Sequence, residues 1–154
     1  MESRDVQTKF DEKKAVKSRF LDLIIPIAGC ISYECFAVNI MNPRRFIEVF
    51  GSRTVIAADA LWFNAHIGFG IYLYRRNFLQ AASTQWKVIY SVFGSAVFNF
   101  GSVLLWGTSK ALLPTVPEGI KVLFGLGSGL LLMYVGWHWT DFLNKQALQL
   151  KEQR

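Results

Sequence analysis

The chain has 154 residues, of which 52% are hydrophobic, 15% aromatic and only 18% charged. Soluble domains carry about a quarter of charged residues, so this composition argues against an ordinary soluble domain. The formal net charge is +6. The Lys and Arg residues lie in separate segments between apolar blocks, which argues against a continuous nucleic-acid-binding surface. We therefore expect a membrane protein without a nucleic-acid partner.

Four apolar blocks follow one another along the chain, at residues 21–41, 55–74, 88–107 and 120–141. Each holds 20 to 22 residues, and a helix needs about 20 to cross ~30 Å of hydrocarbon. The third block contains no charged residue, whereas a soluble helix has a charged face. The connections are too short for a folded domain, so consecutive helices should pack antiparallel. The predicted fold is all-α, an up-down-up-down bundle of four transmembrane helices.

The predicted bundle at residues 21–141 lies between a basic tail at residues 1–20 and a polar tail at residues 142–154. The first tail has apolar residues at roughly helical spacing, which favours an amphipathic segment on the membrane surface. A solvated extension of the first helix is the alternative. Twelve of the 17 Lys and Arg residues lie in the two tails and the second connection. The positive-inside rule therefore places both termini on the cytoplasmic-type side, although three arginines in the first connection oppose this orientation.

Small residues on the third and fourth helices predict packing surfaces. Lipid is as apolar as leucine, so membrane helices associate through small side chains and interhelical hydrogen bonds. The third block carries small and polar residues at spacings of three, four and seven, and the fourth contains G-x-x-x-G with a further glycine on the same face. The predicted packing residues are Ser95, Gly101, Gly125, Gly129 and Gly136. We expect these helices to form a tight pair within the chain or with a second subunit.

Polar side chains inside the blocks predict a binding site. Ionisable groups in hydrocarbon usually face the protein interior and often carry a function. At 1.5 Å per residue, Glu34, Asp59, His66 and Asn99 lie about 6 to 16 Å below the outer helix ends. We predict that these four residues form a ligand-binding pocket in the outer half of the bundle. Glu34, Asp59 and His66 are the candidates for catalysis, because a carboxylate beside an imidazole can exchange protons. Alternatively, they only satisfy one another and set the helix register.

Two histidines on two predicted helices raise the question of bis-histidine haem ligation. His66 and His138 would lie roughly 10 Å apart along the membrane normal, which is too far for one iron. Cys30 and Cys35 point about 140° apart on one helix, so we expect two reduced thiols and no local disulfide or metal site. The sequence therefore predicts no metal and no cofactor.

The sequence contains no nucleotide-binding, hydrolase or metalloprotease motif. The leading hypothesis is an accessory, assembly or scaffold component that binds other membrane proteins, or itself, through its small-residue faces. The alternative is an intramembrane lipid- or sterol-handling protein, or an isomerase, that uses Glu34, Asp59 and His66. A proton-coupled carrier is a third class. Whether the protein is an enzyme stays open at this point.

The membrane in which the protein resides is weakly constrained by its sequence. Reduced cysteines and the absence of an Asn-x-Ser/Thr acceptor fit an internal membrane such as the endoplasmic reticulum. The mitochondrial inner membrane and the bacterial inner membrane are the alternatives.

Overall fold

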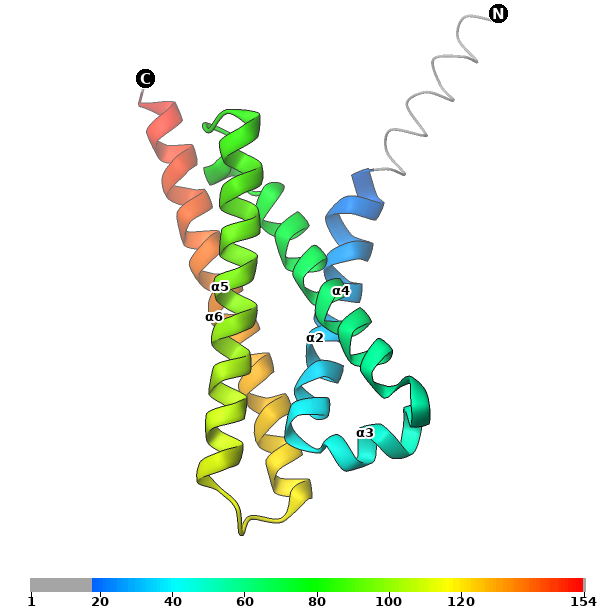
Figure 1. Ribbon diagram of the computed structural model, residues 1–154. Helices are drawn as coiled ribbons and strands as arrows, with labels where there is room; N and C mark the ends of the chain where they lie inside the picture. The colour runs from blue at the N-terminus through cyan, green and yellow to red at the C-terminus, as the bar shows by residue number, and fades with distance from the viewer. Residues whose placement is uncertain (1–17, 154) are drawn as a thin grey trace, which may run out of the picture.

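The computed structural model describes residues 18–153, and every regular element in that range is helical (Figure 1). The four long helices are α2 (Ile25–Met41), α4 (Thr54–Tyr74), α5 (Thr84–Leu112) and α6 (Glu118–Glu152). The short elements are the π-helical turn η1 (Phe20–Ile24), the helix α3 (Pro43–Phe50), and the 3-10 turns η2 (Gly51–Arg53) and η3 (Asn77–Leu79). The prediction of four helices long and apolar enough to cross a membrane is confirmed. The predicted amphipathic tail lies, up to residue 17, outside the described residues.

The last two helices are longer than the apolar blocks that predicted them. α5 covers 29 residues and α6 covers 35. After residue 107 the chain has no proline before Pro114, so α5 can continue to Leu112. After residue 141 it has good helix formers and no proline, so α6 can continue to Glu152. The polar tail that begins at residue 142 therefore continues α6 as far as Glu152. The additional turns carry polar side chains beyond the apolar core of each helix.

The first connection is mostly helical. The Asn42 amide donates to the Val38 carbonyl at 2.8 Å and closes α2. Its side-chain oxygen accepts from the Arg45 amide at 3.2 Å and opens α3, with Pro43 at the favourable first position. Gly51 ends α3 with a φ of 54°, a conformation that favours glycine. α3 lies across one end of the bundle (Figure 1).

α2 and α4 cross at two glycines whose backbones touch. A Cβ atom on Gly29 would lie 2.6 Å from the Gly68 Cα, and one on Gly68 would lie 2.5 Å from the Gly29 Cα. Beside this crossing, the Asn64 amide nitrogen donates to the Ser32 hydroxyl at 2.7 Å and to the Ala28 carbonyl at 3.4 Å. Close approach and an interhelical hydrogen bond are the two means by which membrane helices associate. None of these residues was among the predicted packing residues.

The predicted small-residue faces do pack within the chain, but against other helices than expected. Gly125 of α6 faces the Met41 side chain of α2, where an added Cβ would lie 2.7 Å from Cγ. Ser95 of α5 donates to the His66 carbonyl of α4 at 2.7 Å. Through Gly125 and Ser95, these faces contact α2 and α4.

The remaining predicted packing residues differ from one another. Gly129 faces the carboxyl group of Glu34 on α2. A Cβ on Gly136 would lie 3.7 Å from the Phe98 ring of α5, an ordinary packing distance. Gly101 is exposed, and a Cβ there would meet no atom within 4 Å.

The core at the α3 end is aromatic and joins three helices. Trp106 of α5 is fully buried; its ring lies 4.9 Å from the Tyr33 ring of α2, and its indole N–H donates to the Ser128 hydroxyl of α6 at 3.0 Å. The Tyr33 hydroxyl donates to Ser102 at 2.7 Å. Large apolar side chains are exposed on all four long helices, whereas most buried polar side chains are small. This inverted distribution and the four apolar helices indicate an integral membrane protein.

Candidate functional site

A cavity of about 570 Å³ lies between the four long helices at the end opposite α3. α2 contributes Ile27 and Tyr33, α4 contributes Phe69, α5 contributes Asn99, and α6 contributes Met133. The volume falls within the ~300–1,000 Å³ of typical ligand sites, which are also mostly apolar with a few polar groups. The first turns of α2 and the last turns of α6 lie apart at this end (Figure 1).

The cavity is open at its side, between α2 and α6. Four of its lining residues are about half exposed or more: Leu23, Ile27, Tyr134 and Trp137. The cavity therefore has the shape of a lateral groove with a polar end.

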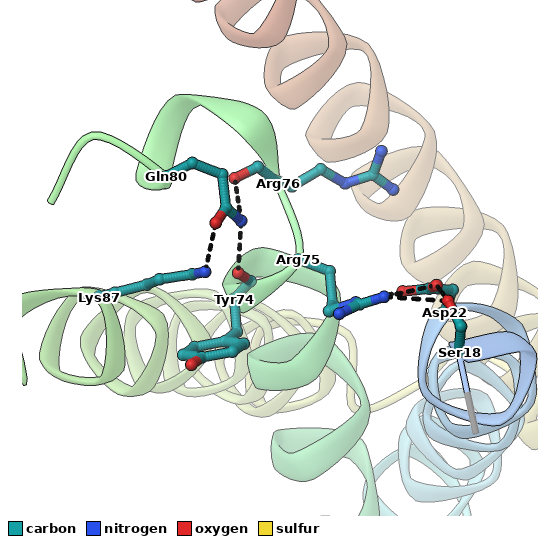
Figure 2. Close-up of polar contacts among 7 residues, drawn as sticks. All are labelled: Ser18, Asp22, Tyr74, Arg75, Arg76, Gln80 and Lys87. Atoms are coloured by element: carbon teal, nitrogen blue, oxygen red, sulfur yellow. Dashed lines mark hydrogen bonds and ion pairs between the residues drawn. The ribbon is translucent and has the colours of Figure 1, made fainter. Parts of the chain in front are cut away.

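The polar end contains Asp22 and Arg76, and Asp22 is engaged by a different arginine. The Arg75 guanidinium contacts both Asp22 oxygens, with Nη2 to Oδ2 at 2.8 Å, and Ser18 donates to the same carboxylate at 2.7 Å (Figure 2). These hydrogen bonds raise the pKa of Arg75, so the guanidinium stays charged. The pair joins the start of α2 to the end of α4.

The side chain of Arg76, the next residue, extends to the same side in Figure 2, but its guanidinium makes no hydrogen bond to Asp22. Its guanidinium lies over the Tyr72 ring, with 3.7 Å between Cζ and the ring centroid. The Arg76 Nε is shielded from solvent and has no hydrogen-bond partner among the described residues. A cation over an aromatic face is held in place by its attraction to the ring.

The connection after α4 fixes the position of both arginines. The Gln80 amide nitrogen donates to the carbonyls of Tyr74 and Arg76, at 3.4 and 3.3 Å. Lys87 donates to the Gln80 side chain at 2.6 Å, as Figure 2 shows. The Asn144 side chain of α6 accepts from the Phe78 amide at 3.2 Å. The second connection is thus bound to α5 and α6 as well as to its own helix.

The structure does not bring the four predicted site residues together. Glu34 faces α6, whereas His66 faces α5 and lies beside the rings of Trp62 and Phe100. Asp59 is exposed. Within the described residues no hydrogen bond or ion pair joins any two of these three side chains. Helix rotation, which residue depth does not define, turns these three side chains toward different neighbours.

Two of the four predicted site residues, His66 and Asn99, have local hydrogen-bond partners. His66 Nδ1 lies 2.9 Å from the Trp62 carbonyl, which makes Nδ1 the protonated nitrogen. Its Nε2 is shielded and unpartnered. Asn99 lines the 570 Å³ cavity and donates from Nδ2 to the Ser95 carbonyl at 2.9 Å. Asn99 is thus the predicted ligand-binding residue that lies at the cavity.

Glu34 is a half-buried residue whose carboxyl group has no partner among the described residues. Both carboxyl oxygens are shielded from solvent and make no hydrogen bond among residues 18–153. An added Cβ on Gly129 would lie 2.6 Å from Oε1, so the carboxyl fills the space that this glycine leaves. A buried acceptor without a partner costs about 1–3 kcal/mol.

Replacing Glu34 by methionine is expected to stabilise the folded protein by about 1–3 kcal/mol, because the side chain keeps its length and loses the unsatisfied oxygens. Thermal unfolding in detergent measures this, with Glu48→Met on the exposed face of α3 as the control. A loss of stability in Glu34→Met alone would mean that a bound molecule or water satisfies the carboxyl group.

Other chemical sites have little support in the described part of the chain. Residues 18–153 contain no group of three or more His, Cys, Asp or Glu side chains that could hold a metal ion. His138 is exposed and packs against Tyr134 and Trp137. Cys30 and Cys35 are both free thiols, and both are exposed. Of these two, Cys30 lines the cavity.

Comparison with protein-family models, with curated proteins and with solved structures found no match. The function is therefore inferred from the residues of this chain. The Gly29–Gly68 crossing and Arg76 are the features that sequence reasoning missed. Ala28 and Ser32 have the four-residue spacing of the G-x-x-x-G in α6, and Ala65 and Gly68 are small residues one turn apart on α4. They were a detectable signal for the crossing.

Proposed function

We propose that this protein is an intramembrane lipid-binding protein that holds an amphiphile in the cavity between its four long helices. The cavity itself carries the proposal: it is apolar along its length, open at its side and polar at one end. An amphiphile has the same distribution, with an apolar chain and a polar head. The proposal concerns binding, and it includes no chemical step.

The proposed membrane arrangement has four crossings with both ends of the chain on the cytoplasmic-type side. The excess of Lys and Arg in the tails and the second connection supports this orientation. Arg76 and the polar end of the cavity would then lie at the cytoplasmic-side interface. An amphiphile would enter sideways from that leaflet with its chain directed toward the membrane centre. An internal membrane such as the endoplasmic reticulum is the proposed location.

Filling the cavity should block this binding. We expect Cys30→Phe to reduce binding of a spin-labelled long-chain amphiphile at least about fivefold, because the new ring occupies the groove that the chain needs. The measurement uses purified protein in phosphatidylcholine nanodiscs. Cys35→Phe is the matched control, since Cys35 is exposed on the same helix and does not line the cavity. Equal binding by the two variants would overturn the proposal.

An accessory role in a membrane complex is the alternative proposal. It requires small-residue faces that are free to bind another protein. Gly125 and Gly129 contact α2 within the chain and are not free for a partner. Gly101 stays exposed on α5. Native mass spectrometry of protein extracted gently from its own membrane separates the two proposals. A retained amphiphile supports lipid binding, whereas a stoichiometric protein partner without a retained lipid supports the accessory role.

A further inference from the structure

We infer that the cavity selects an amphiphile with an anionic head group, and that Arg76 is the residue that binds this head. The inference rests on the proposed lipid binding and adds the chemical class of the ligand. It starts from the charges around the polar end of the cavity. Among residues 18–153, both carboxylates at this end are bound by another cation. Asp22 is held by Arg75, and Asp141 by Lys145 at 2.8 Å.

Arg76 is the cation among the residues that line the cavity, and no ion pair joins it to a carboxylate in the described part of the chain. Arg75 and Lys145 instead pair with Asp22 and Asp141. An anion placed beside Arg76 gains an ion pair without breaking an existing one.

The geometry of Arg76 suits a planar or tetrahedral anion. The Tyr72 ring holds one face of the guanidinium. The shielded Nε lacks a partner among the described residues. Nε and a neighbouring Nη form the two-donor edge that binds phosphate or carboxylate oxygens in parallel. The Arg76 carbonyl is anchored by Gln80 and its amide donates to Leu73 at 2.9 Å, so the residue is held before a ligand arrives.

The apolar part of the ligand follows from the walls next to Arg76. Phe69, Met133 and Ile27 offer no hydrogen-bonding side chain to a second polar group. Asn99 and Tyr33 carry polar groups deeper in the cavity, and both donate to groups of α5: Asn99 to the Ser95 carbonyl and Tyr33 to the Ser102 hydroxyl. The ligand class is thus a long alkyl or acyl chain that ends in a phosphate monoester or carboxylate. Such a head could belong to a single-chain amphiphile or to a two-chain membrane lipid.

The two cysteines supply a readout in the unaltered protein. Cys30 lines the cavity and Cys35 does not, while both thiols are exposed. A bound amphiphile should slow the alkylation of Cys30 by N-ethylmaleimide and leave Cys35 unchanged. The full chain in phosphatidylcholine nanodiscs is titrated with hexadecyl phosphate or with hexadecylphosphocholine, which has the same chain and no net charge. Dioleoyl phosphatidic acid replaces hexadecyl phosphate in a parallel series, and mass spectrometry follows both cysteines.

We expect half-protection of Cys30 at a concentration of an anionic probe that is about tenfold or more below that of hexadecylphosphocholine. Arg76→Gln should remove this preference, and Arg76→Lys should keep part of it because lysine retains the charge without the two-donor edge. Lys151→Gln, which removes the same charge from an exposed position at the end of α6, should behave as the unaltered protein. Protection by hexadecyl phosphate, by phosphatidic acid or by both supports the inference and identifies the one- or two-chain source.

Two results would overturn the inference while lipid binding stands: equal protection by the charged and the zwitterionic probe, or an anionic preference that survives Arg76→Gln. Absence of protection by every probe would reject both the inference and the proposed function. Thermal unfolding of Arg76→Gln in the same nanodiscs checks its fold. If that variant is unfolded, the comparison of probes on the unaltered protein still decides the selectivity.

Discussion

Replacing Gly68 by leucine is expected to disrupt the folded bundle. An added Cβ would lie 2.5 Å from the Gly29 Cα and 3.1 Å from the Ile25 carbonyl oxygen. Both neighbours are backbone atoms, so no side chain can rotate away and the helices must separate. Overpacking in a close-packed site costs about 1–3 kcal/mol and sometimes more. Because separation also strains the Asn64–Ser32 hydrogen bond, we expect the upper end of that range or beyond.

The protein is heated in detergent, and fluorescence-detected size-exclusion chromatography then measures how much of it remains monodisperse. Gly101→Leu is the matched control, since a side chain at that position meets no atom within 4 Å. Gly101→Ala should stabilise the helix by up to about 1 kcal/mol, whereas Gly68→Ala should destabilise the protein. Equal thermal stability of Gly68→Leu and Gly101→Leu would refute the close crossing of α2 and α4.

Removal of the Trp106 side chain is the second change with a large expected effect. Trp106 is fully buried where α2, α5 and α6 meet, against Tyr33 and with a hydrogen bond to Ser128. We expect Trp106→Ala to destabilise the protein by about 3 kcal/mol, mainly through the cavity that it leaves. Trp106→Phe keeps a ring and loses the indole donor, so it should cost about 1 kcal/mol.

Trp86→Ala is the control for this pair of variants, because Trp86 is 54% exposed and stacks on Tyr90 of its own helix. Thermal unfolding in detergent should separate Trp106→Ala clearly from this control. A stability loss in Trp86→Ala equal to that in Trp106→Ala would mean that the aromatic cluster does not hold the three helices together.

The aromatic core around Trp106 and the cavity lie toward opposite ends of the bundle and have different properties. Near α3, aromatic rings and the contacts of Gly125 fill the space between α2, α5 and α6. At the other end α2 and α6 separate, and the cavity lies between them. The bundle is thus closed at one end and open at the other. Gly29 and Gly68 of the close crossing form part of the cavity wall.

The four long helices could be predicted from the sequence because length and hydrophobicity suffice. A block of about 20 apolar residues has one stable form in lipid, a helix whose backbone bonds are satisfied internally. The sequence also predicts that small residues lie where helices pack, and Gly125 and Gly129 do face α2. The helical first connection followed from Asn42 and Pro43, whose capping roles were not used in the prediction.

Only the tertiary structure shows which face of each helix points toward the other helices and which helices contact one another. In a soluble protein the polar face of a helix marks the outside, but here lipid-facing and protein-facing surfaces are both apolar. The sequence alone therefore could not distinguish Gly68, which touches another backbone, from Gly101, which faces open space. The same ambiguity placed Glu34 and His66 in one predicted pocket, although they face different helices. Arg75 and Arg76 are adjacent in the sequence, and only the fold shows that one is neutralised by Asp22 while the other lines the cavity.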